Sequence, residues 1–64
     1  MKTEEEIIEK IEEKIPYIGI KPISHNIIGI ELLLYSQLKG EKATYELIKE
    51  LGLDELGWYV PEEV

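Results

Sequence analysis

The first periodic pattern of apolar residues begins close to the N-terminus. Four isoleucines fall on one side of a helix: Ile7, Ile8, Ile11 and Ile15. Charged residues fill most of the other positions, which is typical of a helix with one face in water. Thr3 and Glu6 have the spacing of a capping box. Pro16 is expected to end this helix, because a proline biases the residue before it away from helical backbone angles. The pattern therefore predicts a helix over residues 3–15.

The middle of the chain is the most apolar part. Seven of the nine residues in 27–35 are apolar and point almost all the way round a helix axis, which indicates a central element covered by its neighbours. We predict a helix over residues 24–39, with Ser24 as N-cap and Gly40 just after its end. The preceding stretch 16–23 contains two prolines and a glycine. It is expected to be extended and to bury three isoleucines: Ile18, Ile20 and Ile23.

A β-hairpin at about 17–33 is the alternative for this region. Residues 17–23 and 27–33 would then pair as strands, because isoleucine is a good strand former. The apolar run continues unbroken past residue 33, however, and the hairpin would end its second strand in the middle of that run. The pattern favours the helix, and with it an all-α, compact three-helix domain.

A third helix is predicted over Glu41–Leu51. One face carries its apolar residues: Ala43, Leu47, Ile48 and Leu51. Gly52 is expected to end it, and Asp54 can cap one further turn that stops at Gly57. Trp58 and Tyr59 are expected to fold back on the core, before a frayed acidic tail over residues 60–64.

Composition narrows the classes of function. We expect one small domain over residues 1–64, with no disulfide, because the chain has no cysteine. No metal site is predicted, and a His/Cys zinc site is not plausible with one histidine. The net charge is −7 and all seven basic residues are lysines, which argues against direct binding to nucleic acid or to an anionic membrane. The abundance of isoleucine, lysine and glutamate fits a protein built for high temperature, or low-GC coding with no thermal meaning. We expect a source such as an archaeon or its virus.

The N-terminus and the central apolar run both indicate where in the cell the protein is expected. The acidic N-terminus lacks the apolar stretch of a secretory signal. The central run is far shorter than the roughly 20 residues that cross a bilayer. We therefore expect a soluble, cytoplasmic protein.

Residues 40–53 resemble the first helix and turn of a DNA-binding helix-turn-helix motif. The recognition helix would then come from residues 55–63, which contain Gly57 and Pro61, three carboxylates and no basic residue. A helix that lies against phosphates needs basic side chains. DNA binding through this element is therefore not expected.

Polar residues gather at the expected start of the central helix. A helix N-terminus presents free backbone N–H groups that can hold a phosphate or carboxylate. The candidate ligand-binding residues are Ser24, His25, Asn26 and Lys21. The plainer interpretation is that Ser24 and Asn26 cap the helix and His25 lies on the surface.

Glu31 is the titratable residue with the most apolar sequence surroundings. If it is buried, it could take part in proton transfer. Otherwise it lies at the edge of the helix packing and reaches water or a lysine, or it lies in a subunit interface. No second polar group that could support catalysis is identifiable, so no catalytic residue is predicted.

Two further features suggest contact with another protein. Gly29 and Ser36 are small residues on one side of the central helix and would allow another backbone to approach closely. Trp58 and Tyr59 are of the types that dominate interface hot spots. The candidate interface residues are Gly29, Leu33, Ser36, Trp58 and Tyr59. Alternatively the small residues pack within the chain and Trp58 closes the core.

These observations favour a non-enzymatic protein–protein interaction or assembly module without a cofactor, which forms a homo-oligomer or binds a protein partner. The reasons are the excess of apolar residues for so short a chain and the absence of a chemical site. The alternative is an acidic inhibitor or regulator that binds a basic nucleic-acid-binding protein. A small enzyme or ligand carrier that uses residues 24–26 is the third hypothesis.

Overall fold

The protein folds into three α-helices and two short 3-10 helices. The computed structural model describes residues 3–62. Its elements are α1 (Glu4–Lys14), η1 (Ile15–Tyr17), α2 (Pro22–Lys39), α3 (Glu41–Glu50) and η2 (Leu53–Leu56). Residues 3–62 contain no strand, so the all-α three-helix prediction is confirmed and the hairpin at 17–33 is wrong.

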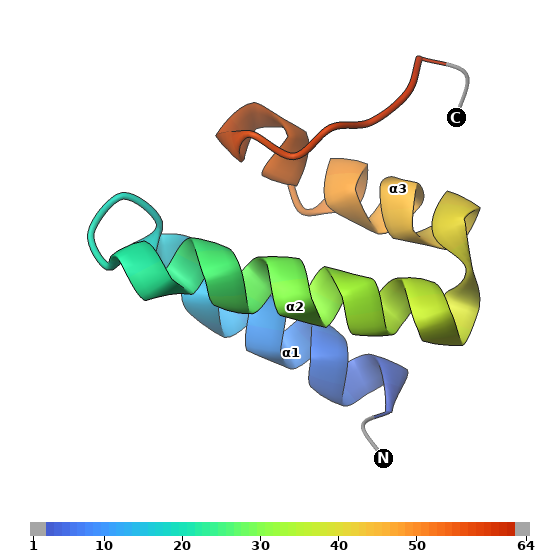
Figure 1. The fold of residues 1–64 in the computed structure, drawn as a ribbon, viewed down its shortest axis with the longest axis horizontal. Coiled ribbons are helices and arrows are strands. Elements are labelled where there is room, and N and C mark those ends of the chain that lie inside the picture. Colours follow the sequence, from blue (N-terminus) through green and yellow to red (C-terminus); the bar gives the residue numbers. More distant parts are fainter. Residues whose placement is uncertain (1–2, 63–64) are drawn as a thin grey trace.

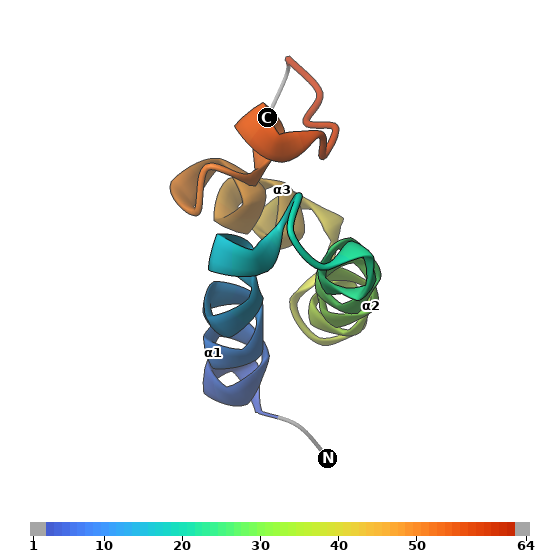
Figure 2. The ribbon, with the colours of Figure 1, turned by 90° about the vertical axis from the view of Figure 1, so that its left-hand side faces the viewer.

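Helix α2 is the element on which the other two helices pack (Figure 1). Helix α1 runs back along α2, and α3 returns across it after a sharp turn, while η2 and the C-terminal segment lie beyond α3 (Figure 2). All three α-helices and η2 contribute to one core of buried side chains: Ile7, Ile11, Ile28, Leu32, Tyr35, Leu47, Ile48 and Leu53. The central position predicted for the apolar helix is confirmed.

The start of α1 has the predicted capping box, but its end differs from the prediction. The backbone N–H of Glu6 donates to Thr3 Oγ1 at 3.2 Å, and the N–H of Thr3 donates to Glu6 Oε1 at 3.1 Å. Ile15 keeps helical angles (φ −53°, ψ −45°), so the expectation that Pro16 would drive it out of the helical region is wrong. Pro16 lies in the first turn of η1, where its missing N–H is not needed.

The segment that leads into α2 is neither extended nor largely buried, contrary to prediction. Ile20 is 73% exposed and Ile23 is 59% exposed. Gly19 takes a positive φ of 85°, which lets the chain turn here. Helix α2 then begins at Pro22, because the fixed φ of proline suits the first helical position. Lys21 is therefore the N-cap, and the assignment of that role to Ser24 is wrong.

A single residue, Gly40, joins α2 to α3. It has φ 94° and ψ 166°, angles that side-chain-bearing residues rarely adopt. Its carbonyl accepts a hydrogen bond from Thr44 Oγ1 at 2.8 Å, which fixes the first turn of α3. This turn folds α3 back over α2, so that residues of both helices line one groove.

The end of the chain is more ordered than predicted. Trp58 and Val60 pack against the core, so fraying does not begin at Val60. The last two residues of the predicted acidic tail, 63–64, lie outside the described part of the chain. No helix within residues 3–62 combines the length and apolar character needed to cross a membrane.

Candidate interaction surface

The outward side of α2 is apolar and carries no charge. Asn26, Ile30, Leu33 and Gln37 follow one another at intervals of four, three and four residues and form a line that we call the α2 seam. Ile30 is 60% exposed and Leu33 is 59% exposed. From Pro22 to Leu38 the only Asp, Glu, Lys or Arg is Glu31, which is 2% exposed. From Pro22 to Leu38 the exposed face of α2 is therefore uncharged, in a chain where 33% of residues are charged.

An open groove of about 550 Å³ lies beside the seam, between α2, α3 and the segment after η2. All five residues predicted for the interface line this one groove: Gly29, Leu33, Ser36, Trp58 and Tyr59. They come from two stretches that are more than 20 residues apart in the sequence. Their assembly depends on the return of the chain at Gly40.

The two small residues on α2 leave space at the groove. A Cβ atom on Gly29 would meet no other atom within 4 Å. Glycine is therefore not needed here for packing within the chain, as the alternative interpretation required. Ser36 Oγ donates to the carbonyl of Leu33 in its own helix at 2.7 Å. Both residues line the open groove.

Trp58 and Tyr59, near the C-terminal end, have different surroundings. The ring of Trp58 stacks on His25, with 4.2 Å between ring centroids and 17° between planes. Trp58 is half-buried and packs against the core, as the alternative interpretation proposed. Tyr59 is 75% exposed at the groove. The stack holds the segment that carries Tyr59 against the start of α2.

The four candidate ligand residues lie at the start of α2, but their side chains have different neighbours. Ser24 is buried and His25 lies against Trp58. The Lys21 ammonium lies 4.9 Å from the centre of the Tyr17 ring, a cation–π contact. Asn26 is exposed on the seam. The structure therefore does not gather these side chains around one point, and ligand binding there stays a prediction.

Glu31 is buried on the inner side of α2, with 2% of its surface exposed. The expectation that it lies at the edge of the packing and reaches water is wrong. Among residues 3–62, no three acidic or histidine side chains are placed to hold a metal ion.

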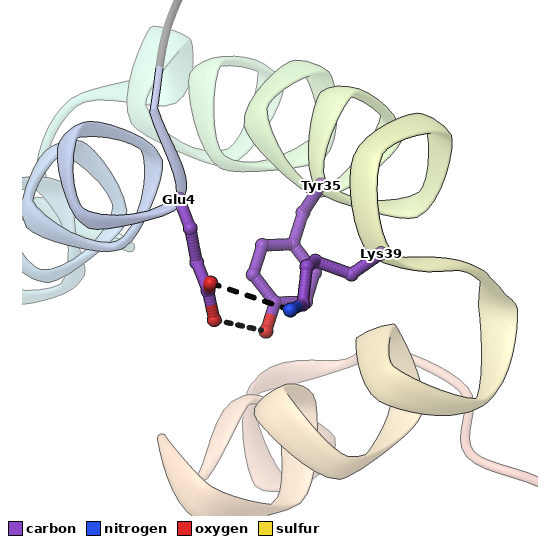
Figure 3. Close-up of polar contacts among 3 residues, drawn as sticks. All are labelled: Glu4, Tyr35 and Lys39. Carbon is purple, nitrogen blue, oxygen red and sulfur yellow. Dashed lines mark hydrogen bonds and ion pairs between the residues drawn. The ribbon is translucent and has the colours of Figure 1, made fainter.

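A second groove, of about 370 Å³, lies between α1 and α3. Four carboxylates line it: Glu4, Glu12, Glu46 and Glu50. Tyr35 from α2 also lines it, and its hydroxyl donates to Glu4 Oε1 at 3.3 Å. Lys39 Nζ lies 3.5 Å from the other oxygen of Glu4 (Figure 3). The sequence does not indicate this groove, because its carboxylates come from two helices that only the fold brings to one space.

Burial and the carboxylates of the acidic groove both act on the phenol of Tyr35. Burial, followed by the nearby charge of Glu4 and its hydrogen bond, raises the pKa of Tyr35 above the ordinary value of 10.0. Glu50 and Glu46 raise it further. The folded protein therefore keeps this proton at a pH where the unfolded chain begins to lose it. Stability should fall as the pH rises above about 10.

We expect Tyr35→Phe to remove part of this alkaline loss. The measurement is the melting temperature from pH 8 to pH 12, and the decline should be shallower for Tyr35→Phe than for the unmodified protein. Tyr59→Phe is the matched control, because that phenol is exposed. An equal decline in Tyr35→Phe and the unmodified protein would contradict the assignment of this loss of stability to the Tyr35 hydroxyl.

Comparison of the chain with models of protein families, with curated proteins and with solved structures found no match.

Proposed function

We propose that this protein is a non-enzymatic assembly module that self-associates through the α2 seam. The supporting observation is the uncharged outward face of α2, with Ile30 and Leu33 more than half exposed. Exposed apolar surface is costly in water, and a contiguous patch of it commonly marks a protein-binding site. The expected cytoplasmic location is retained as part of the proposal.

The charge distribution favours a second copy of the chain as the partner that binds the α2 seam. The net charge of −7 makes two copies repel each other in most orientations. Contact between two α2 faces brings no exposed carboxylate of α2 into the interface. The exposed apolar side chains of this face and Tyr59 offer on the order of 500 Å² per copy, so a dimer would bury about 1,000 Å² in total, near the lower limit for a specific interface.

The salt dependence of self-association tests this proposal. Dimerisation by apolar contact should be retained or strengthened at high salt, because salt screens the repulsion between two acidic copies. Sedimentation equilibrium at low and high ionic strength measures this. Association that weakens steeply with salt would count against an apolar interface.

The acidic groove favours a second candidate function, the binding of a basic protein. Its four glutamates would attract the lysine and arginine side chains of a basic helical segment, as the inhibitor hypothesis requires. A lysine-rich amphipathic peptide is the probe. Binding of this peptide should weaken as salt is added, the opposite of the dependence expected for the dimer.

A further inference from the structure

We infer that two copies dock antiparallel along α2, in a register that sets Ile30 against Leu33 of the second copy and Asn26 against Gln37 of the second copy. This inference rests on the proposed self-association and adds its geometry. A two-fold axis would pass between residues 30 and 33, so that each contact occurs twice.

The seam has the spacing that helix pairing requires. Residues 26, 30, 33 and 37 alternate steps of four and three, as the facing positions of a coiled coil do. From either end, the side chains of the seam follow the same order: one amide, two aliphatic side chains and one amide. Antiparallel pairing therefore matches apolar with apolar in the middle and amide with amide at each end. Mismatch of such polar residues is what fixes register in paired helices.

The residues that flank the seam match in the same register. Gly29 would lie opposite Ser36 of the second copy, so both sides of that flank are small and the helix axes can approach closely. On the other flank, Ile27 would lie opposite Leu34 of the second copy. Ile27 and Leu34 are both half-buried in the single chain.

Charges at the two ends of α2 favour the antiparallel direction over the parallel one. Lys21 precedes the helix and Glu41 follows it, and both are exposed. Lys39, in the last turn of α2, lies 3.5 Å from Glu4 of its own chain, so its charge is already paired. Glu41 lines the groove beside the seam. Antiparallel docking brings Lys21 near Glu41 of the second copy, at both ends. Parallel docking would bring lysine to lysine and glutamate to glutamate, and the two helix dipoles would also be aligned unfavourably.

Disulfide trapping tests the direction and the register, because the chain has no cysteine of its own. Asn26→Cys and Gln37→Cys are prepared separately, mixed in equal amounts and equilibrated in a glutathione redox buffer. Both positions are exposed, so both variants should fold. Antiparallel docking predicts that disulfides between the two different variants greatly exceed half of the trapped dimers, as measured by mass spectrometry. Two identical variants would place their cysteines about 16 Å apart, too far for a disulfide.

The control is a mixture of Glu9→Cys and Glu13→Cys on the exposed side of α1, which should give only the statistical proportion of mixed dimers. Predominance of disulfides between identical variants would overturn the antiparallel direction, while self-association would stand. A statistical mixture from the seam variants would overturn the register. If the unmodified protein is also monomeric in sedimentation, both the register and the proposed function fail.

Discussion

Replacing Leu33 by glutamate is expected to leave the protein folded but monomeric. Leu33 is 59% exposed, so the single chain tolerates a polar group at this position. In the dimer the new carboxylate would lie against Ile30 of the second copy, with no basic side chain on the seam to pair with it. Removal of an unpaired charge from water costs several kcal/mol, and it would occur twice per dimer. Because about 1.4 kcal/mol is tenfold in affinity, we expect association at least 100-fold weaker.

The matched control is Leu56→Glu. Leu56 is 39% exposed on η2, beyond α3, and the substitution makes the same change in charge and side chain. Sedimentation equilibrium should show normal dimerisation of this variant, and circular dichroism should show both variants folded. Equal loss of association in both would mean that net charge, and not the seam, controls the dimer.

Replacing Ile28 by alanine is expected to cost about 2–5 kcal/mol of folding stability. Ile28 is fully buried in the face of α2 that packs against the other helices. A 64-residue domain has roughly 3–10 kcal/mol in total, at 0.05–0.15 kcal/mol per residue. One cavity at this position could therefore remove most of the stability. Urea denaturation at a protein concentration below that of association measures the difference.

Ile20→Ala provides the comparison, because it deletes the same atoms from a side chain that is 73% exposed. Its effect should stay within about 0.5 kcal/mol. If Ile28→Ala were no more destabilising than Ile20→Ala, α2 would not be the centre of the core.

The start of α1 and the end of α3 could be predicted because local signals determine them. The capping box of Thr3 and Glu6 fixes the start of α1, and Gly52 follows the end of α3. The predicted start of α2 is wrong because Pro22 begins the helix and does not break it. Proline at the first helical position needs no N–H and already has helical φ. The helix could thus begin two residues earlier than Ser24.

The faces of α2 could not be assigned from the sequence. A helix with apolar residues on every side gives no sign of which side faces the core until α1 and α3 are placed. Ile30 and Gln37 were therefore not recognised as neighbours on an exposed line, although their spacing with Asn26 and Leu33 is visible in the sequence. The small residues and the aromatic pair could be picked out by residue type alone.

The contacts that build both grooves depend on tertiary structure. The stack of Trp58 on His25 joins residues far apart in the chain, and it brings Tyr59 to the side of α2. The acidic groove likewise needs Glu4 of α1 and Glu50 of α3 to face one space. No local sequence pattern predicts that these distant residues lie close together.

Sedimentation equilibrium of the unmodified protein over a wide range of concentration tests the central claim most directly. The uncharged face of α2 predicts that the apparent mass rises reversibly from 7.4 kDa towards twice that value. A mass that stays at 7.4 kDa at every concentration would show that this face remains in water, and it would contradict the proposed assembly.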